Sequence, residues 1–96
     1  MEIIDSEPHG WFLLRDGNDF LLDVNCSYSA VSFDMVVRLT SAEVQAYGVE
    51  GRPFVSRLAD TVQNEALTEF RSRNVAGEVG PRVLAAIIAE RGSRAA

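Results

Sequence analysis

Alternating apolar and polar residues mark one segment of this chain more clearly than any other. Between residues 30 and 39 the apolar side chains occupy every second position, as Val31, Phe33, Met35, Val37 and Leu39. Successive side chains of a β-strand point to opposite faces, so this spacing gathers the apolar groups on one face. The pattern predicts a strand over residues 30–39 whose odd-numbered side chains point into the core.

Two shorter strands are expected before it, over residues 10–15 and 19–26. Asp16-Gly17-Asn18 between them is typical of a turn, because Gly and Asn tolerate positive φ. A four-residue turn at 27–30 then leads into the third strand. This order predicts a three-stranded antiparallel meander with residues 19–26 in the middle. The acidic lead-in before it has room for a short strand over residues 2–5.

The next segment has helix signals. Thr40 and Glu43 have the spacing of a capping box, in which each side chain bonds the other's backbone N–H, and they predict a helix over residues 41–47. Pro53 suits the first turn of a second helix, and an apolar stripe continues from it to residue 73. Leu67 is off that stripe, which a break near residues 63–64 would explain. The pattern leaves open whether residues 53–73 form one helix or two.

A last helix is expected over residues 81–91, beginning at Pro81 after a loop at 74–80. Strands followed by helices in 96 residues indicate one domain, residues 1–96, of the α+β class. We predict that the helices pack on one face of the meander.

The two turn lengths fix which side chains share a face. Even-numbered side chains from Phe12 to Cys26 then share the core with the odd-numbered side chains of the third strand. The outer face then carries an apolar row of Leu13, Leu21 and Val36. Beside it lies a row with one aromatic and two carboxylate groups, Trp11, Asp23 and Asp34. These six residues are our candidate interface: Trp11, Leu13, Leu21, Asp23, Asp34 and Val36.

In this register Asp23 and Asp34 lie directly opposite each other, which is mildly destabilising for like charges. Three interpretations remain: both are solvated, both receive an arginine or lysine of a partner, or both hold a divalent ion or share a proton. An ion would need further oxygen ligands, and the sequence does not point to any. The apolar row has another interpretation, in which residues 74–91 cross behind the sheet and bury it as a second core.

Charge is unevenly distributed along the chain. Its 14 acidic residues and nine arginines, with no lysine, give a formal net charge of −5. Residues 1–50 hold nine acids against two arginines, a charge of −7, whereas residues 51–96 hold five acids against seven arginines, a charge of +2. An acidic first half argues against nucleic-acid binding, because phosphate repels carboxylate, and suits a basic partner.

Few residues can carry covalent chemistry. Cys26 and His9 are the only thiol and imidazole, and the predicted strands place them on opposite faces. We find no zinc-like Cys/His spacing, nucleophile elbow or phosphate loop, so the sequence favours neither a metal nor a cofactor, and it leaves enzymatic activity open but not favoured. No signal peptide is recognised, and no apolar run approaches the ~20 residues that span a bilayer, so we expect a cytoplasmic chain without a membrane partner.

These observations favour a small acidic protein-interaction module whose partner is another protein or its own copy. It would act as a homodimer, or as an inhibitor- or immunity-type binder, through its sheet face or edge. The alternative is a small-molecule- or metal-binding domain that uses Asp23 and Asp34 on the outer sheet face.

Overall fold

The computed structural model describes residues 1–7, 10–28, 31–66 and 70–95. Its four strands form one antiparallel sheet in chain order, and they are β1 (Glu2–Glu7), β2 (Trp11–Asp16), β3 (Asp19–Tyr28) and β4 (Val31–Arg38). The helices that follow are α1 (Ser41–Glu50), α2 (Arg52–Glu65), the short 3-10 helix η1 (Arg71–Arg73) and α3 (Ala76–Ala95). The predicted α+β class and meander order are confirmed, and the short strand for which the lead-in had room is present as β1 beside the three strands expected.

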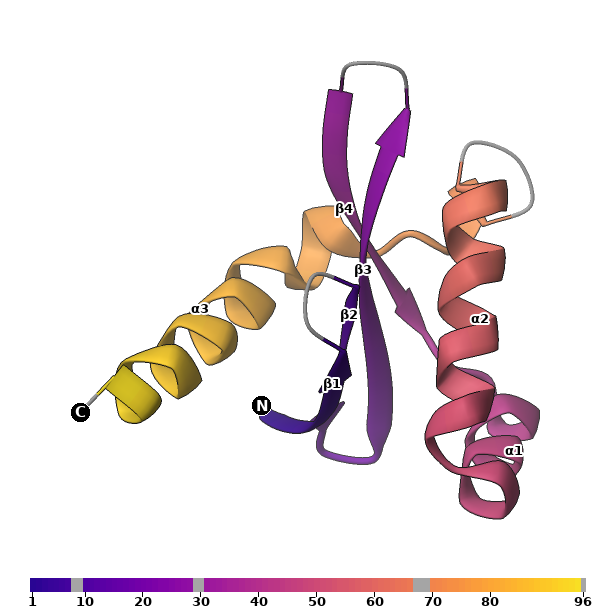
Figure 1. Cartoon of the computed structure of the whole chain (residues 1–96), viewed down its shortest axis with the longest axis horizontal. Coiled ribbons are helices and arrows are strands. Elements are labelled where there is room, and N and C mark those ends of the chain that lie inside the picture. The colour runs from indigo at the N-terminus through magenta and orange to yellow at the C-terminus, as the bar shows by residue number, and fades with distance from the viewer. Residues whose placement is uncertain (8–9, 29–30, 67–69, 96) are drawn as a thin grey trace.

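The sheet is the middle layer of the molecule, with helices on both sides (Figure 1). On one side, α1 and α2 cover the first core, which includes Leu22, Val24, Val37 and Val55. On the other side, α3 covers the second core, in which Leu21 packs with neighbours from β2, β4 and α3. The prediction that all helices pack on one face is therefore wrong for α3. The alternative of a second core behind the sheet is the arrangement observed.

The turn between β2 and β3 is one residue shorter than predicted. Asp16 pairs with Asp19, which leaves two turn residues, and the positive φ of 63° at Gly17 is one that glycine adopts without strain. Leu13 therefore lies opposite Leu22, and not beside Leu21 as the three-residue loop required. A one-residue change in register exchanges the two faces of a strand, so the predicted orientation of β2 is wrong.

The pairing of β3 with β4 keeps the predicted faces but is shifted by two residues. Val24 lies opposite Met35 and not Phe33, because the strands continue to Tyr28 and Val31 and shorten the turn between them. An even shift leaves each side chain on the same face. The odd-numbered side chains from Phe33 to Leu39 do lie on the face of the first core, as predicted.

The helix starts follow the local signals. The Thr40 side chain accepts from the Glu43 N–H at 3.2 Å and the Glu43 carboxylate accepts from the Thr40 N–H at 2.8 Å, so the capping box is confirmed. Gly51, with φ of 72°, ends α1 three residues later than predicted and precedes α2. Helix α2 ends at Glu65, close to the suggested break, and η1 is a separate turn. Leu67 lies outside the described residues.

Helix α3 begins five residues before Pro81, so most of the predicted loop at 74–80 is helical. The Asn74 side-chain oxygen accepts from the Ala76 N–H at 3.0 Å, which stabilises the first turn. The same oxygen accepts from the Val36 N–H at 3.2 Å, and the Val36 carbonyl accepts from the Val75 N–H at 2.8 Å. These bonds fasten the start of α3 to the free edge of β4.

Arginines of the second half pair with acids of the first half and tie the helices to the sheet. Arg82 of α3 lies 2.9 Å from Asp16, and Arg52 of α2 lies 2.6 Å from Glu7. Arg38 and Asp19 on neighbouring strands lie 3.4 Å apart. In the described chain, no helix is both long and apolar enough to cross a membrane.

Candidate functional site

A hollow of about 570 Å³ lies between α3 and the outer face of the sheet, and we call it the α3 groove. Its size is in the range of small-molecule sites. The sheet side of the groove is lined by Gly10, Phe12, Asp23, Asn25, Asp34 and Val36. The helix side is lined by Ala76, Gly80, Val83, Leu84 and Ile87.

Among the charged and polar residues that the structure describes, Asp23 is the one that is buried, with 7% of its surface exposed. It lies on β3 between Phe12 of β2 and Val36 of β4, so its neighbours across the sheet offer no polar side chain. Its Oδ1 has no hydrogen-bond partner among the described residues. An acceptor in this position is costly to the fold, and such groups are rare in native proteins.

The surroundings of Asp23 change its acidity. Burial, and next the nearby charge of Asp34, raise the pKa of the Asp23 carboxyl from 3.8 to about 7. At neutral pH this group therefore exchanges readily between a neutral acid, which can donate a hydrogen bond, and a carboxylate, which cannot. Groups of this kind cluster at functional sites, although structural burial also produces them.

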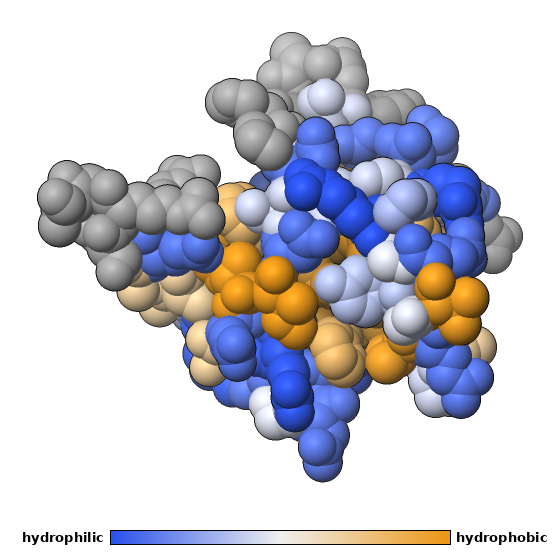
Figure 2. Space-filling view, turned by 60° about the horizontal axis from the view of Figure 1, so that its bottom comes forward, coloured by the Kyte–Doolittle hydropathy of each residue, from blue (hydrophilic) through white to orange (hydrophobic). Residues whose placement is uncertain are grey.

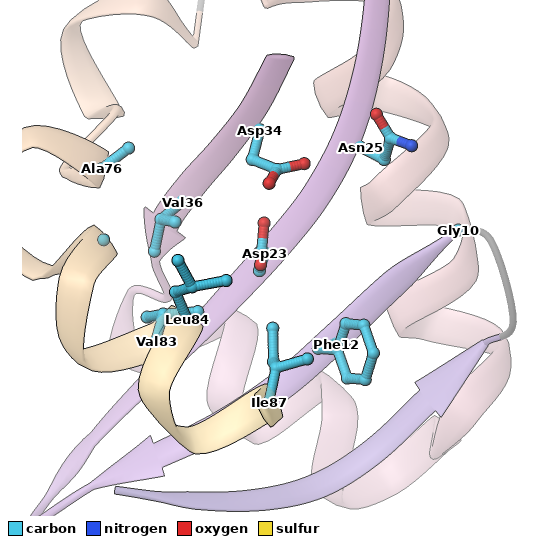
Figure 3. A pocket seen from close by; sticks show the side chains of 11 residues that line it. Gly10, Phe12, Asp23, Asn25, Asp34, Val36, Ala76, Val83, Leu84 and Ile87 are labelled. Atoms are coloured by element: carbon cyan, nitrogen blue, oxygen red, sulfur yellow. The ribbon is translucent and has the colours of Figure 1, made fainter. Parts of the chain in front are cut away.

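Asp34 and Asn25 extend the polar part of the groove. They lie opposite each other on β4 and β3, two pairs along from Asp23 and Val36 and on the same face, and both are exposed. Asp23 and Asp34 are thus diagonal neighbours, and the predicted placement directly opposite each other is wrong. Figure 3 shows both carboxylates on the side of the sheet that faces α3. Both lie on the face opposite the first core, where the sequence register placed them, and α3 covers this face over Asp23.

The other four candidate residues are buried, on both sides of the sheet. Trp11 and Leu13, 4% and 0% exposed, belong to the first core, and the Arg52 guanidinium lies 5.7 Å from the Trp11 ring centroid. Leu21 and Val36, 1% and 2% exposed, belong to the second core beneath α3. The predicted row of Leu13, Leu21 and Val36 therefore does not form.

Phe12 and Leu14 take the outer-face positions that were assigned to Trp11 and Leu13. Sequence reasoning missed this exchange because residues 11–14 are all apolar, and a strand apolar on both faces gives no alternation to read. One signal was available. Adjacent apolar pairs occur in all three strands, at 13–14, 21–22 and 36–37, and they are typical of a sheet covered on both faces.

Cys26 does not belong to this site. Its side chain is 2% exposed in the first core, on the opposite face of the sheet, and burial raises the pKa of its thiol. It is a small buried hydrophobe, as predicted. His9 lies outside the described residues.

The α3 groove can hold a ligand through polar contacts and apolar packing, and its chemistry for a metal is poor. It offers two carboxylates, and no group of three or more His, Cys, Asp or Glu side chains suited to a metal is found in the described residues. A second hollow, of about 380 Å³, lies between the β2–β3 turn and α1. Its carboxylate, Asp19, is already paired with Arg38.

No protein-family model, curated protein or solved structure matches this chain.

Proposed function

We propose that this chain is a binding domain for a small organic molecule, which lies in the α3 groove between the sheet and α3. The observation that carries this proposal is the Asp23 carboxyl, which lines the groove, is almost fully buried and has an oxygen without a partner in the described chain. A bound ligand that donates a hydrogen bond would remove this cost. The second function expected from the sequence was a domain that binds a small molecule or a metal through Asp23 and Asp34. The unpartnered carboxyl oxygen supports the small-molecule version of that function over the metal version.

Two glycines of α3 provide a matched test. Gly80 lines the groove whereas Gly77, one turn earlier, does not, and a Cβ added at either position meets nothing within 4 Å. Gly80→Leu should fill part of the groove, and Gly77→Leu should make a similar change outside it. Because leucine favours helix more than glycine does, neither substitution should unfold the protein.

The measurement is an NMR titration of amide signals with three six-carbon probes: n-hexanol, n-hexylammonium and hexanoate. We expect saturable shifts at groove residues such as Asp23 and Val83 for at least one probe, in the wild type and in Gly77→Leu. In Gly80→Leu the affinity should fall about tenfold or more, as for a blocked apolar site. Absence of saturable shifts with all three probes, or equal binding by Gly80→Leu, would contradict the proposal.

The protein-interaction module remains a second candidate, and its support now comes from α3. Leu84 and Ile88, one helical turn apart, are 58% and 59% exposed, although large apolar side chains usually find cover. Figure 2 shows apolar residues gathered between hydrophilic margins on one face of the molecule. We propose self-association through this part of α3, in a chain expected to be cytoplasmic.

The mass in solution tests this second candidate. If α3 mediates a homodimer, light scattering should give about twice the chain mass at high concentration, and Ile88→Glu should return it to the mass of one chain. Ala85→Glu, at an exposed position on the same helix, is the control for added charge. A single-chain mass at every concentration would reject self-association.

A further inference from the structure

The α3 groove has a polar end and an apolar end. Figure 3 shows Asp34 and Asn25 toward one end, Phe12 and Ile87 toward the other, and Asp23 between them. A ligand that uses the whole groove therefore needs a polar group attached to an apolar body. The charges around the groove then decide what kind of polar group it can be.

Both ionisable groups that line the groove are acids. Asp34 is exposed, Asp23 is buried, and none of the lining residues in the described chain is basic. The nearest arginine along α3, Arg82, is held 2.9 Å from Asp16. An anionic ligand would meet two acids without a compensating cation, and this is unfavourable in a partly buried site.

We propose, resting on the binding function above, that the ligand of the α3 groove is an organic monocation with an apolar body, whose charged nitrogen lies between Asp23 and Asp34. An ammonium or guanidinium group carries several N–H donors and accepts none. It can therefore donate to the unpartnered Asp23 oxygen and to Asp34 together. Such charge-assisted hydrogen bonds are about twice as strong as neutral ones.

The acidity of Asp23 agrees with a cationic ligand. Two causes raise its pKa to about 7, first its burial and then the charge of Asp34. Its neighbours on the sheet, Phe12 of β2 and Val36 of β4, are uncharged. The side chains of α3 that line the opposite side of the groove, Val83, Leu84 and Ile87, are uncharged as well. A cation beside Asp23 counters both causes, so binding should favour the ionised carboxylate and strengthen as the pH rises through about 7.

The three six-carbon probes separate the charge of the ligand from its shape. At pH 8, where the amine is protonated and most of Asp23 is ionised, n-hexylammonium should bind about tenfold more tightly than n-hexanol. Hexanoate should bind more weakly than n-hexanol. The readout is the dissociation constant from the amide titration, together with the location of the shifted signals.

Two aspartate variants assign the preference to the groove. Asp23→Asn keeps the shape of the side chain and should reduce the ratio of hexylammonium to hexanol affinity to about one or two, since one neutral amide replaces the buried charge. Asp60→Asn makes the same change at an exposed position on α2, on the far side of the sheet, and should keep the wild-type ratio. Binding of n-hexanol should be similar in both variants, which shows that each is folded.

Each other result overturns part of the assignment. Equal or tighter binding of n-hexanol by the wild type would reject a cationic ligand while leaving the groove as a binding site. An equal loss of preference in Asp60→Asn would assign the preference to the net charge of −5, and not to Asp23. Absence of binding by every probe would reject the proposed function itself.

Discussion

At the scale of single residues, Asp23 stands out because the fold places an acid where an apolar side chain would pack better. Phe12 and Val36 flank it across the sheet, and its Oδ1 lacks a partner in the described part of the chain. Replacing a buried polar group by an apolar one of similar shape is often neutral or stabilising. A residue that costs stability in this way is a reasonable place to look for function.

This position predicts an unusual dependence of stability on pH. With a pKa of about 7 in the folded state and 3.8 when unfolded, Asp23 binds more protons in the folded protein between these values. Its contribution therefore favours the fold at low pH and is lost as the pH rises toward 7. At ~1.4 kcal/mol per pKa unit, the loss in the free energy of unfolding is at most about 4 kcal/mol, and it is smaller where water reaches the carboxyl.

Urea unfolding at pH 5 and pH 8 measures this contribution. Between pH 5 and pH 8, the wild type and Asp60→Asn should both lose the stability that the protonated Asp23 carboxyl contributes. Asp23→Asn should not show this loss, and it should be more stable than the other two proteins at pH 8. The same pH dependence in Asp23→Asn would show that the Asp23 carboxyl is not the group responsible.

At the scale of elements, Asn74 joins two parts of the fold that are distant in sequence. Its side-chain oxygen accepts from Val36 on β4 and from Ala76 at the start of α3. This amide therefore helps to set the position of α3 on the sheet, and with it the α3 groove, together with the Val75–Val36 backbone bond and the second core. The sequence showed Asn74 only as a loop residue, because its partner on β4 is 38 residues away.

Asn74→Ala should lower the free energy of unfolding by about 1–2 kcal/mol, since it removes a helix-start bond and leaves the Val36 N–H without that acceptor. Asn64→Ala, at an exposed position of α2, is the matched control and should change stability by less than about 0.5 kcal/mol. Urea unfolding of both variants checks this. A loss in Asn74→Ala no larger than in the control would mean that the two bonds contribute little in solution.

Local signals predicted the elements well and their packing less well. The capping box at Thr40 and the alternation over residues 31–39 each specify local structure through neighbours in sequence, and both predictions are confirmed. The face of β2 depended on whether the turn at Gly17 has two residues or three, which the sequence does not decide. That single residue determined whether Trp11 or Phe12 faced the groove, so two of the six candidate residues, Trp11 and Leu13, were placed on the wrong side.

At the scale of the whole molecule, one sheet separates two cores. Val55 of α2 is fully buried in the first core and Val83 of α3 is 2% exposed in the second. The strands between the two cores supply side chains to both. We therefore expect the two halves to unfold together in one cooperative transition, as small domains usually do.

Val55→Ala and Val83→Ala test this expectation. Each should destabilise the protein by about 1.5–2.5 kcal/mol, from two lost methyl groups and the cavity they leave. Because the sheet lies between the two sites, the losses should add in the double variant to within about 0.5 kcal/mol. Circular dichroism and tryptophan fluorescence during urea unfolding should give the same midpoint for each variant. Separate midpoints would show that α3 unfolds independently.

The contact between Asn74 and β4 has a consequence for how copies of this chain behave when crowded. An uncovered edge strand is a template on which identical strands can stack into filaments. Here the donor and acceptor of Val36 that face outward are already occupied by Asn74 and Val75, within the most apolar part of that strand. Growth of a fibril from this edge would first have to displace the chain's own residues.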